Sequence, residues 1–143
     1  MEKGKFTFTI IKPKAIKQGH MIGIFNMIDQ AEFKIRAMKM THMSIDDAKE
    51  FYSIHKDKAF FDSLIKFMSS GHVVVAVLEK ENAVEDFRNL IGSTNPAEAK
   101  PGTIRHKYAS SLTENAVHGS DSNENAMKEI AFFFSRREIF NIQ

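Results

Sequence analysis

The chain has 143 residues, of which 43% are hydrophobic, which suits one domain with a single core, spanning residues 1–143. It contains no cysteine, so disulfides and thiolate metal sites are excluded, and a formal net charge of +2 is too small to favour a nucleic-acid partner. No apolar run approaches the roughly 20 residues that cross a membrane and no signal peptide precedes the first strand, so we expect a cytoplasmic protein without a membrane partner.

The first third of the chain predicts a strand, a helix and a second strand. Residues 6–11 are rich in aromatic and β-branched residues and stop at Lys12 and Pro13, so Lys12 should stand at the end of a strand. Residues 20–31 predict a helix with apolar residues on more than one side, covered by core and a loop or by a partner subunit. Residues 33–37 alternate as a strand does, and a change of phase after Ala37 indicates a β-bulge.

The middle of the chain predicts two helices, a strand and another helix. Ser44 is a candidate N-cap for a helix that runs to about Ile54 and carries Tyr52. A second helix is expected at residues 59–68, where the aromatic spacing, including Phe60, is typical of core. Residues 73–78 form a continuous apolar run, typical of a central strand. Residues 82–91 predict a helix that ends at Gly92.

The last third begins with a stretch that has no periodicity. Residues 93–113 predict a long loop, and such a loop in a small domain is either a wrong assignment or functional. Its Thr94 and Arg105, with Asn115, are polar groups that could converge on an anion. A short strand with His118 and a helix at residues 126–134, with Glu129 at the edge of its apolar face, complete the chain.

This order of elements fits a βαββαβ plan, in which helices cover one face of a four-stranded sheet in an α+β fold. An RNA-binding domain shares the plan, but that function needs exposed aromatic residues on the third strand, and residues 73–78 contain none. Standard phosphate-loop, dinucleotide, nucleophile-elbow and zinc-protease motifs are absent. The six histidines show no paired ligand spacing, so the sequence gives no indication of a protein-held transition metal.

Residues 115–122 place His118 before Gly119, which would let a ligand approach the backbone, and before a capping-box pattern at Asp121 and Glu124. A lone histidine at such a turn is more often structural than catalytic. Phosphoryl transfer is nevertheless attractive, because a neutral imidazole accepts a phosphoryl group and passes it on. The reaction needs further groups that the chain offers: a carboxylate to orient the ring, fixed cations, and Mg²⁺ held mainly by the nucleotide phosphates rather than by the protein. The candidates are Glu129 for the carboxylate and Lys12, Arg88 and Arg105 for the cations.

The motif Asn-x-x-His-Gly-Ser-Asp-Ser at residues 115–122 resembles the active-site signature of the nucleoside diphosphate kinases. The likeness extends to Ile-Ile-Lys-Pro at residues 10–13, Asp-Lys-Ala-Phe-Phe at 57–61, Gly-Ser-Thr-Asn-Pro-Ala at 92–97 and Pro-Gly-Thr-Ile-Arg at 101–105. It implies a ferredoxin-like fold and a Mg²⁺-dependent ping-pong reaction that maintains nucleoside triphosphate pools. A nucleoside triphosphate such as ATP would phosphorylate His118, and a nucleoside diphosphate would then take the phosphoryl group.

The resemblance also implies roles for individual residues. His118 is the nucleophile through Nδ1, with Glu129 bonded to its other ring nitrogen and Tyr52 and Ser120 supporting the site. Lys12 contacts the transferred phosphoryl group and the ribose 3′-hydroxyl. The remaining nucleotide-binding residues are Asn115 at that hydroxyl, Arg88, Thr94 and Arg105 at the distal phosphates, and Phe60 and Leu112 on the two sides of the base. Stacking does not depend on base identity, which suits a broad substrate range.

Several positions depart from the family pattern without removing a catalytic residue. They are Lys14, Lys58-Ala59, His72 in place of proline, Lys80, and His106-Lys107. Lys14, Lys58 and Lys107 would strengthen a positive field near the site. For the assembly, the resemblance implies a homohexamer, favoured by the prolines of the loop at residues 93–113, with a homotetramer as the alternative. A catalytically silent nucleotide-binding or scaffold protein of the same fold is the alternative function.

Overall fold

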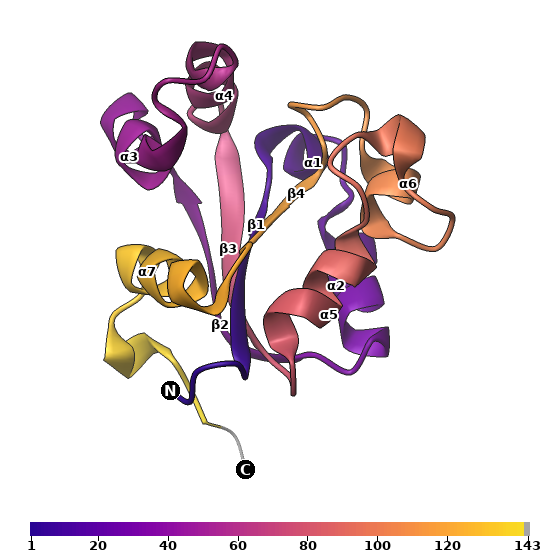
Figure 1. The fold of residues 1–143 in the computed structure, drawn as a ribbon, viewed down its shortest axis with the longest axis vertical. Helices are drawn as coiled ribbons and strands as arrows, with labels where there is room; N and C mark the ends of the chain where they lie inside the picture. The colour runs from indigo at the N-terminus through magenta and orange to yellow at the C-terminus, as the bar shows by residue number, and fades with distance from the viewer. Residues whose placement is uncertain (142–143) are drawn as a thin grey trace.

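A four-stranded antiparallel sheet runs through the middle of the molecule, with helices on both sides (Figure 1). The computed structural model describes residues 1–141, so residues 142 and 143 of the predicted domain lie outside the description. The strand order is β2-β3-β1-β4, which confirms the predicted ferredoxin-like α+β fold. The strands are β1 (Phe6–Ile11), β2 (Lys34–His42), β3 (His72–Glu79) and β4 (Val117–Gly119).

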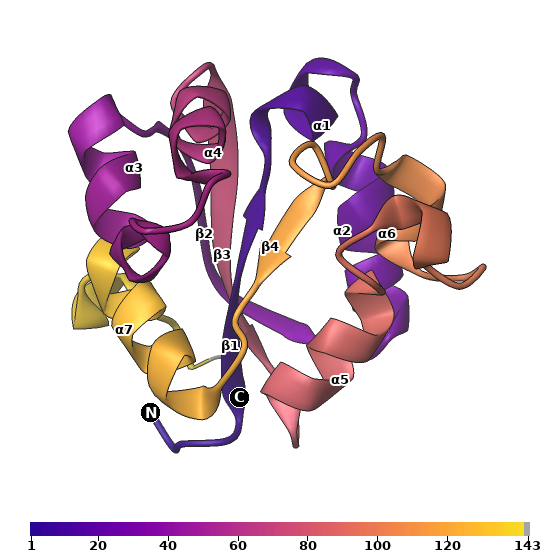
Figure 2. The ribbon, with the colours of Figure 1, turned by 45° about the horizontal axis from the view of Figure 1, so that its top comes forward.

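Seven α-helices are divided between the two faces of the sheet over the described residues. They are α1 (Pro13–Lys17), α2 (Met21–Gln30), α3 (Ile45–Phe51), α4 (Phe61–Met68), α5 (Ala83–Ile91), α6 (Ile104–Tyr108) and α7 (Asn123–Phe133). Helices α3, α4 and α7 lie on one side of the sheet and α1, α2, α5 and α6 on the other (Figure 2). No helix in residues 1–141 is long and apolar enough to span a membrane.

The expectation that helices cover one face of the sheet is therefore wrong, and strand β3 shows why. Its residues from Val73 to Leu78 are all buried. Val73, Val75 and Val77 belong to the core under α3, α4 and α7, whereas the intervening Val74, Ala76 and Leu78 belong to the core on the opposite face. Since successive side chains of a strand point to opposite faces, a continuous apolar run requires cover on both.

The turn after β1 and the stretch before β4 contain helices that the sequence did not predict. Pro13 is the first residue of α1, where its fixed φ and missing N–H suit a helix start, so Lys12 directly follows β1, as predicted, and is also the N-cap of α1. Within the expected loop at 93–113, residues Pro96–Glu98 form a 3₁₀ turn and Ile104–Tyr108 form α6, capped by the hydroxyl of Thr103. Both are too short to show a helical period.

Three predicted boundaries are shifted by one to three residues. The capping box at Ser44 is present, but α3 ends at Phe51, so Tyr52 is its C-cap and a 3₁₀ turn follows at Ser53–His55. The β-bulge falls between Ile35 and Ala37 rather than after Ala37. Helix α7 starts at Asn123, with Ser122 as the N-cap whose Oγ accepts from the N–H of Asn125, and not at a capping box from Asp121.

We predict that Phe87→Ala lowers the free energy of unfolding by about 3–5 kcal/mol, because it removes a large side chain from a core that cannot fully collapse. Phe87 on α5 is completely buried and its ring packs edge-on against Phe33, with centroids 5.5 Å apart. Urea denaturation measures the change. Phe60→Ala is the matched control because Phe60 is 47% exposed; equal losses for the two variants would contradict the prediction.

Candidate phosphoryl-transfer site

His118 lies in the middle of β4, where antiparallel pairing sets it opposite Ile10 of β1. The hydroxyl of Thr9 donates a 2.8 Å hydrogen bond to the backbone oxygen of His118, which adds to the strand pairing. The imidazole ring is held separately, because its Nε2 lies 2.8 Å from Oε1 of Glu129 on α7. Strand β1 therefore holds the backbone of this histidine, and α7 holds its ring.

The contact with Glu129 decides which nitrogen of His118 is free. An ionised carboxylate only accepts hydrogen bonds, so Nε2 carries the proton and Nδ1 of the neutral ring keeps its lone pair. The buried Ser120 donates a 2.7 Å hydrogen bond to the same oxygen of Glu129. Glu129 thus accepts from two donors, and Nδ1 is the ring nitrogen of His118 that remains available.

Aromatic rings enclose the imidazole. The ring centroids of Phe51, Tyr52 and Phe8 lie 5.4, 6.0 and 6.2 Å from that of His118. The hydroxyl of Tyr52 is buried and has no hydrogen-bond partner in the described chain, and burial, together with the nearby Glu129, raises the Tyr52 pKa. The roles of Phe8 and Phe51 were missed from the sequence, because aromatic residues at these spacings resemble ordinary core.

A second group of predicted residues gathers at the end of β1. The Nζ of Lys12 is buried and lies 2.6 Å from Oδ1 of Asn115, while the Lys12 backbone N–H donates to Ala116 O at 2.9 Å. The amide of Asn115 reaches the backbone oxygen of Thr94 at 3.4 Å. Burial, together with the charge of Arg105, lowers the pKa of Lys12 to about 7. A phosphate would supply the anion that this lysine lacks.

Arg105 joins the same group from α6. Its guanidinium donates to three backbone oxygens, those of Asn115 at 3.3 Å, Gly92 at 3.0 Å and Val117 at 3.0 Å. These bonds connect three segments around the site and leave two of its five N–H groups for an anion. Burial and the positive charge of Arg88 lower the pKa of Arg105 to about 10. Arg88 itself is exposed on α5.

Two small residues between these groups, Ala116 and Gly119, have special surroundings or conformation. Ala116 has a φ of 74° although it is not glycine, a conformation that costs roughly 1–3 kcal/mol and is compatible with a functional turn. Gly119 serves packing rather than ligand approach, which corrects the expectation from the sequence. A Cβ there would lie 2.9 Å from Ile91 and 3.1 Å from Phe87 of α5. Gly119 therefore lets α5 pack closely behind the strand of His118.

The two residues expected to enclose a base lie on the surface. Phe60 at the start of α4 is 47% exposed and Leu112 in the segment before β4 is 59% exposed. The His55 ring packs against Phe60 with centroids 5.6 Å apart. His55 in turn lies beside Tyr52, with ring centroids 6.4 Å apart. Exposed apolar side chains next to an open site are suited to stacking on a ligand.

Two of the additional lysines are paired with acids. Lys14 lies 2.6 Å from Glu114 and Lys80 lies 3.0 Å from Asp86. The ion pair of Lys14 fastens the turn after β1 to the segment that carries Asn115, and it offsets the charge that was expected to strengthen a positive field. Lys58 and Lys107 remain exposed.

The residues present do not build a metal cage of their own. Within residues 1–141, no three histidine or carboxylate side chains are grouped to hold a metal ion.

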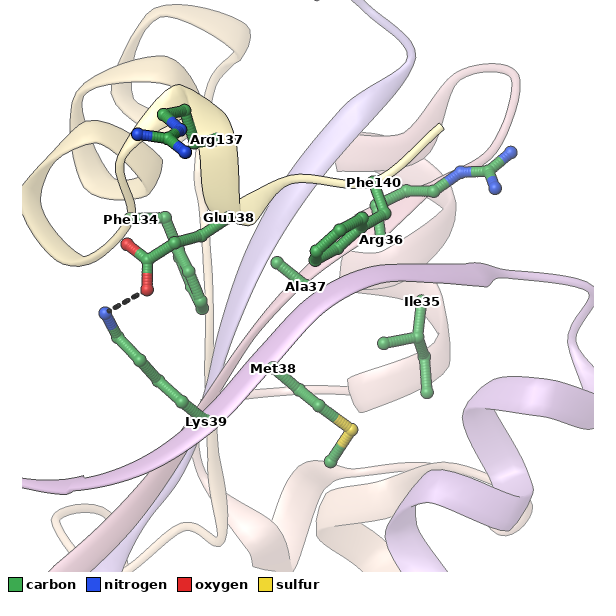
Figure 3. Close-up of a pocket in the computed structure, with 9 residues that line it drawn as sticks. All are labelled: Ile35, Arg36, Ala37, Met38, Lys39, Phe134, Arg137, Glu138 and Phe140. Atoms are coloured by element: carbon green, nitrogen blue, oxygen red, sulfur yellow. Dashed lines mark hydrogen bonds and ion pairs between the residues drawn. The ribbon is translucent and has the colours of Figure 1, made fainter. Parts of the chain in front are cut away.

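A hollow of about 430 Å³ elsewhere on the surface lies between β2 and the segment after α7 (Figure 3), and none of its lining residues is a predicted site residue.

Comparisons with known proteins agree with this arrangement. The family described as nucleoside diphosphate kinase matches residues 5–139. A curated nucleoside diphosphate kinase of Flavobacterium psychrophilum is 58% identical over 134 residues, which are 94% of this chain and 96% of the relative. The crystal structure of the Aquifex aeolicus nucleoside diphosphate kinase superposes with a TM-score of 0.93 at 42% identity and covers 95% of this chain and 99% of its own. A halophilic nucleoside diphosphate kinase of Halobacterium salinarum, solved in complex with CDP, has a TM-score of 0.93 at 34% identity, with coverages of 98% and 93%.

We predict that binding of ADP at pH 8 takes up protons. With a pKa of about 7, only about one tenth of Lys12 is charged in the free protein at this pH. A bound phosphate favours the charged form and raises the pKa, so a proton enters with the ligand. Phosphate esters, whose second pKa is about 6, contribute little at pH 8. Calorimetry in buffers of different ionisation enthalpy measures the uptake.

Lys12→Gln should lose this proton uptake, whereas Lys14→Gln, two residues away and paired on the surface, should keep it. A binding heat for the unchanged protein that does not depend on the buffer would contradict the prediction.

Proposed function

Because this chain belongs to the nucleoside diphosphate kinase family and transfers phosphoryl groups between nucleotides, we propose that His118 carries the phosphoryl group between the two substrates. The observation that supports this role is the bond between His118 Nε2 and Glu129, which leaves Nδ1 as the free nucleophile. The alternative function, a catalytically silent nucleotide-binding protein, has no support from the fold, the site or the relatives.

In the first half-reaction, Nδ1 of His118 attacks the terminal phosphorus of a nucleoside triphosphate. The Nδ1–P bond forms as the bond to the bridging oxygen breaks, and the nucleoside diphosphate leaves with the electron pair. The ring becomes positively charged, and Glu129 stabilises that charge through Nε2–H. In the second half-reaction, a different nucleoside diphosphate attacks the phosphohistidine and restores the neutral ring.

The charge that moves during transfer is met by groups that are already in place. Lys12 lies at the transferred phosphoryl group and at the ribose 3′-hydroxyl, which Asn115 also holds, and the 2.6 Å contact between these two side chains supports their acting together. Arg88, Thr94 and Arg105 bind the distal phosphates. The bonds of Arg105 to three carbonyls fix its position before substrate arrives, so little reorganisation accompanies the reaction.

The hydroxyl of Tyr52 is available to the phosphoryl group on His118, since it is buried beside that ring and lacks a partner in the described residues. Ser120 acts through Glu129, which it holds at 2.7 Å. Phe60 and Leu112 stack on the base from two sides. Both contacts are apolar, so binding depends weakly on which base is present.

Magnesium enters as part of the substrate, bound to the nucleotide phosphates, where it offsets their charge. The site fits such a substrate because its fixed groups are cations and amides and no carboxylate cage competes for the ion in the described chain. The reaction proceeds in the cytoplasm, which the absence of cysteine suits.

The assembly is a homohexamer, with a homotetramer as the alternative. What supports self-association is a long edge strand, β2, beside exposed apolar side chains on the same side of the molecule. Met38 and Met40 on this strand and Ile22 on α2 are 48%, 56% and 71% exposed. Pro96 and Pro101 precede α6 in the segment at residues 93–113. They restrict its backbone, which suits a second contact surface between subunits.

We expect one acid-labile phosphoryl group on the protein after it is mixed with Mg-ATP, and none on His118→Asn. Intact-mass spectrometry at neutral pH measures the label, and addition of GDP should remove it as GTP appears. His20→Asn is the control, because it removes a half-buried histidine away from the site. An unlabelled wild-type protein, or a labelled His118→Asn, would show that the proposed carrier is wrong.

We also expect light scattering after gel filtration to give a mass near that of six chains of 16.3 kDa, about 98 kDa, rather than the ~65 kDa of a tetramer. Met40→Glu places a charge on the edge strand and should reduce the mass. Ile54→Glu is the matched control because Ile54 is 67% exposed and lies away from that strand. A monomer for the unchanged protein, or equal effects of both variants, would contradict this assembly.

A further inference from the structure

Two histidines that are thirty residues apart in sequence face each other at one end of the sheet. His42 is the last residue of β2 and His72 is the first residue of β3, and they are direct partners in the antiparallel register. Directly paired residues point to the same face of a sheet. Both side chains are exposed, and their ring centroids are 5.6 Å apart with the planes at 62°. The linear spacing of the histidines gave no sign of this pair.

The hydrogen bonding of the pair leaves nitrogen lone pairs free. Nε2 of His42 lies 2.8 Å from the backbone oxygen of Ser69. A carbonyl only accepts, so Nε2 carries the hydrogen and Nδ1 retains a lone pair. A ring N–H donated to a backbone carbonyl is the usual way in which a metal-ligating histidine is oriented. In residues 1–141, the His72 ring has no hydrogen bond or ion pair, and its one ring contact is with His42.

The separation of the rings suits two ligands on one ion. With metal–nitrogen distances near 2.0–2.1 Å, two imidazoles at angles of about 90–109° have centroids roughly 4.5–5.2 Å apart. Small side-chain rotations bring the observed 5.6 Å into this range. The described chain groups no third histidine or carboxylate with them, so water completes the coordination.

We infer that His42 and His72 form a two-histidine site for a divalent transition-metal ion such as Zn²⁺ or Cu²⁺. Imidazole selects these ions over Mg²⁺, which prefers oxygen ligands, so the Mg²⁺ that accompanies the nucleotide does not compete. A bound ion joins the end of the edge strand β2 to the central strand β3. Because it binds the folded arrangement, it stabilises the fold in proportion to its occupancy.

This site is distinct from the phosphoryl-transfer site. His42 and His72 lie on the same face of the sheet as the paired residues Met40 and Val74. This is the face covered by α1, α2, α5 and α6, and Val74 belongs to its core. His118 packs on the opposite face, and its strand β4 is the opposite edge of the sheet. Metal at the histidine pair is therefore out of contact with the reacting atoms.

The test is a calorimetric titration in which Zn²⁺ is added to the assembled protein. The protein carries no polyhistidine tag, and the buffer contains excess Mg²⁺ but no nucleotide. We expect one Zn²⁺ per chain, and a loss of roughly tenfold or more in affinity for both His42→Gln and His72→Gln. The matched control is His106→Gln. His106 is exposed and its Nδ1 lies 3.0 Å from the Ala99 carbonyl, but within residues 1–141 its ring is not paired with a second histidine ring. Its removal should leave the affinity unchanged.

Electron paramagnetic resonance of the unchanged protein with one equivalent of Cu²⁺ gives a readout that does not depend on the variants, and two nitrogen ligands are expected. The inference fails if the wild-type protein shows no saturable Zn²⁺ binding in Mg²⁺, or if both glutamine variants bind as the wild type does. It fails equally if His118→Gln, rather than these variants, abolishes binding, since the ion would then lie at the phosphoryl-transfer site.

Discussion

The short pairing of β4 with the central strand β1 is the constraint on which the rest of the site depends. Three residue pairs set His118 opposite Ile10, and they carry its ring to the face where Glu129 of α7 can reach it. Close packing of α5 behind Gly119 holds this short strand in place. A strand of three residues would be weak alone, so its position is secured by the layers of helices on both faces.

The second constraint is electrostatic, because two basic side chains are held partly out of water before any anion arrives. Burial lowers the pKa values of Lys12 and Arg105, and both side chains are kept near each other by Asn115 and by backbone oxygens. A bound phosphate favours the charged form of both groups and so raises their pKa values. The fold supplies the free energy for this preorganisation through its two apolar cores, which is the general basis of electrostatic catalysis.

The two edges of the sheet serve different purposes. The edge at β4 is short and carries His118, whereas the edge at β2 is nine residues long and displays methionines to the surface. The last residue of β2 is His42, which pairs with His72. His72 stands where the family pattern has proline. A long open edge needs a device that limits unwanted pairing, and either a partner subunit or a bound ion at its end would provide one.

The sequence by itself determined the family, the four strands and the longer helices, because motifs and hydrophobic periods are short-range features of the chain. It was enough to single out His118, Glu129 and Lys12. Only the tertiary structure decided that helices cover both faces of the sheet, that Gly119 serves packing, and that His42 meets His72. These outcomes depend on the register between segments far apart in the chain, and register is set by burial across the whole fold.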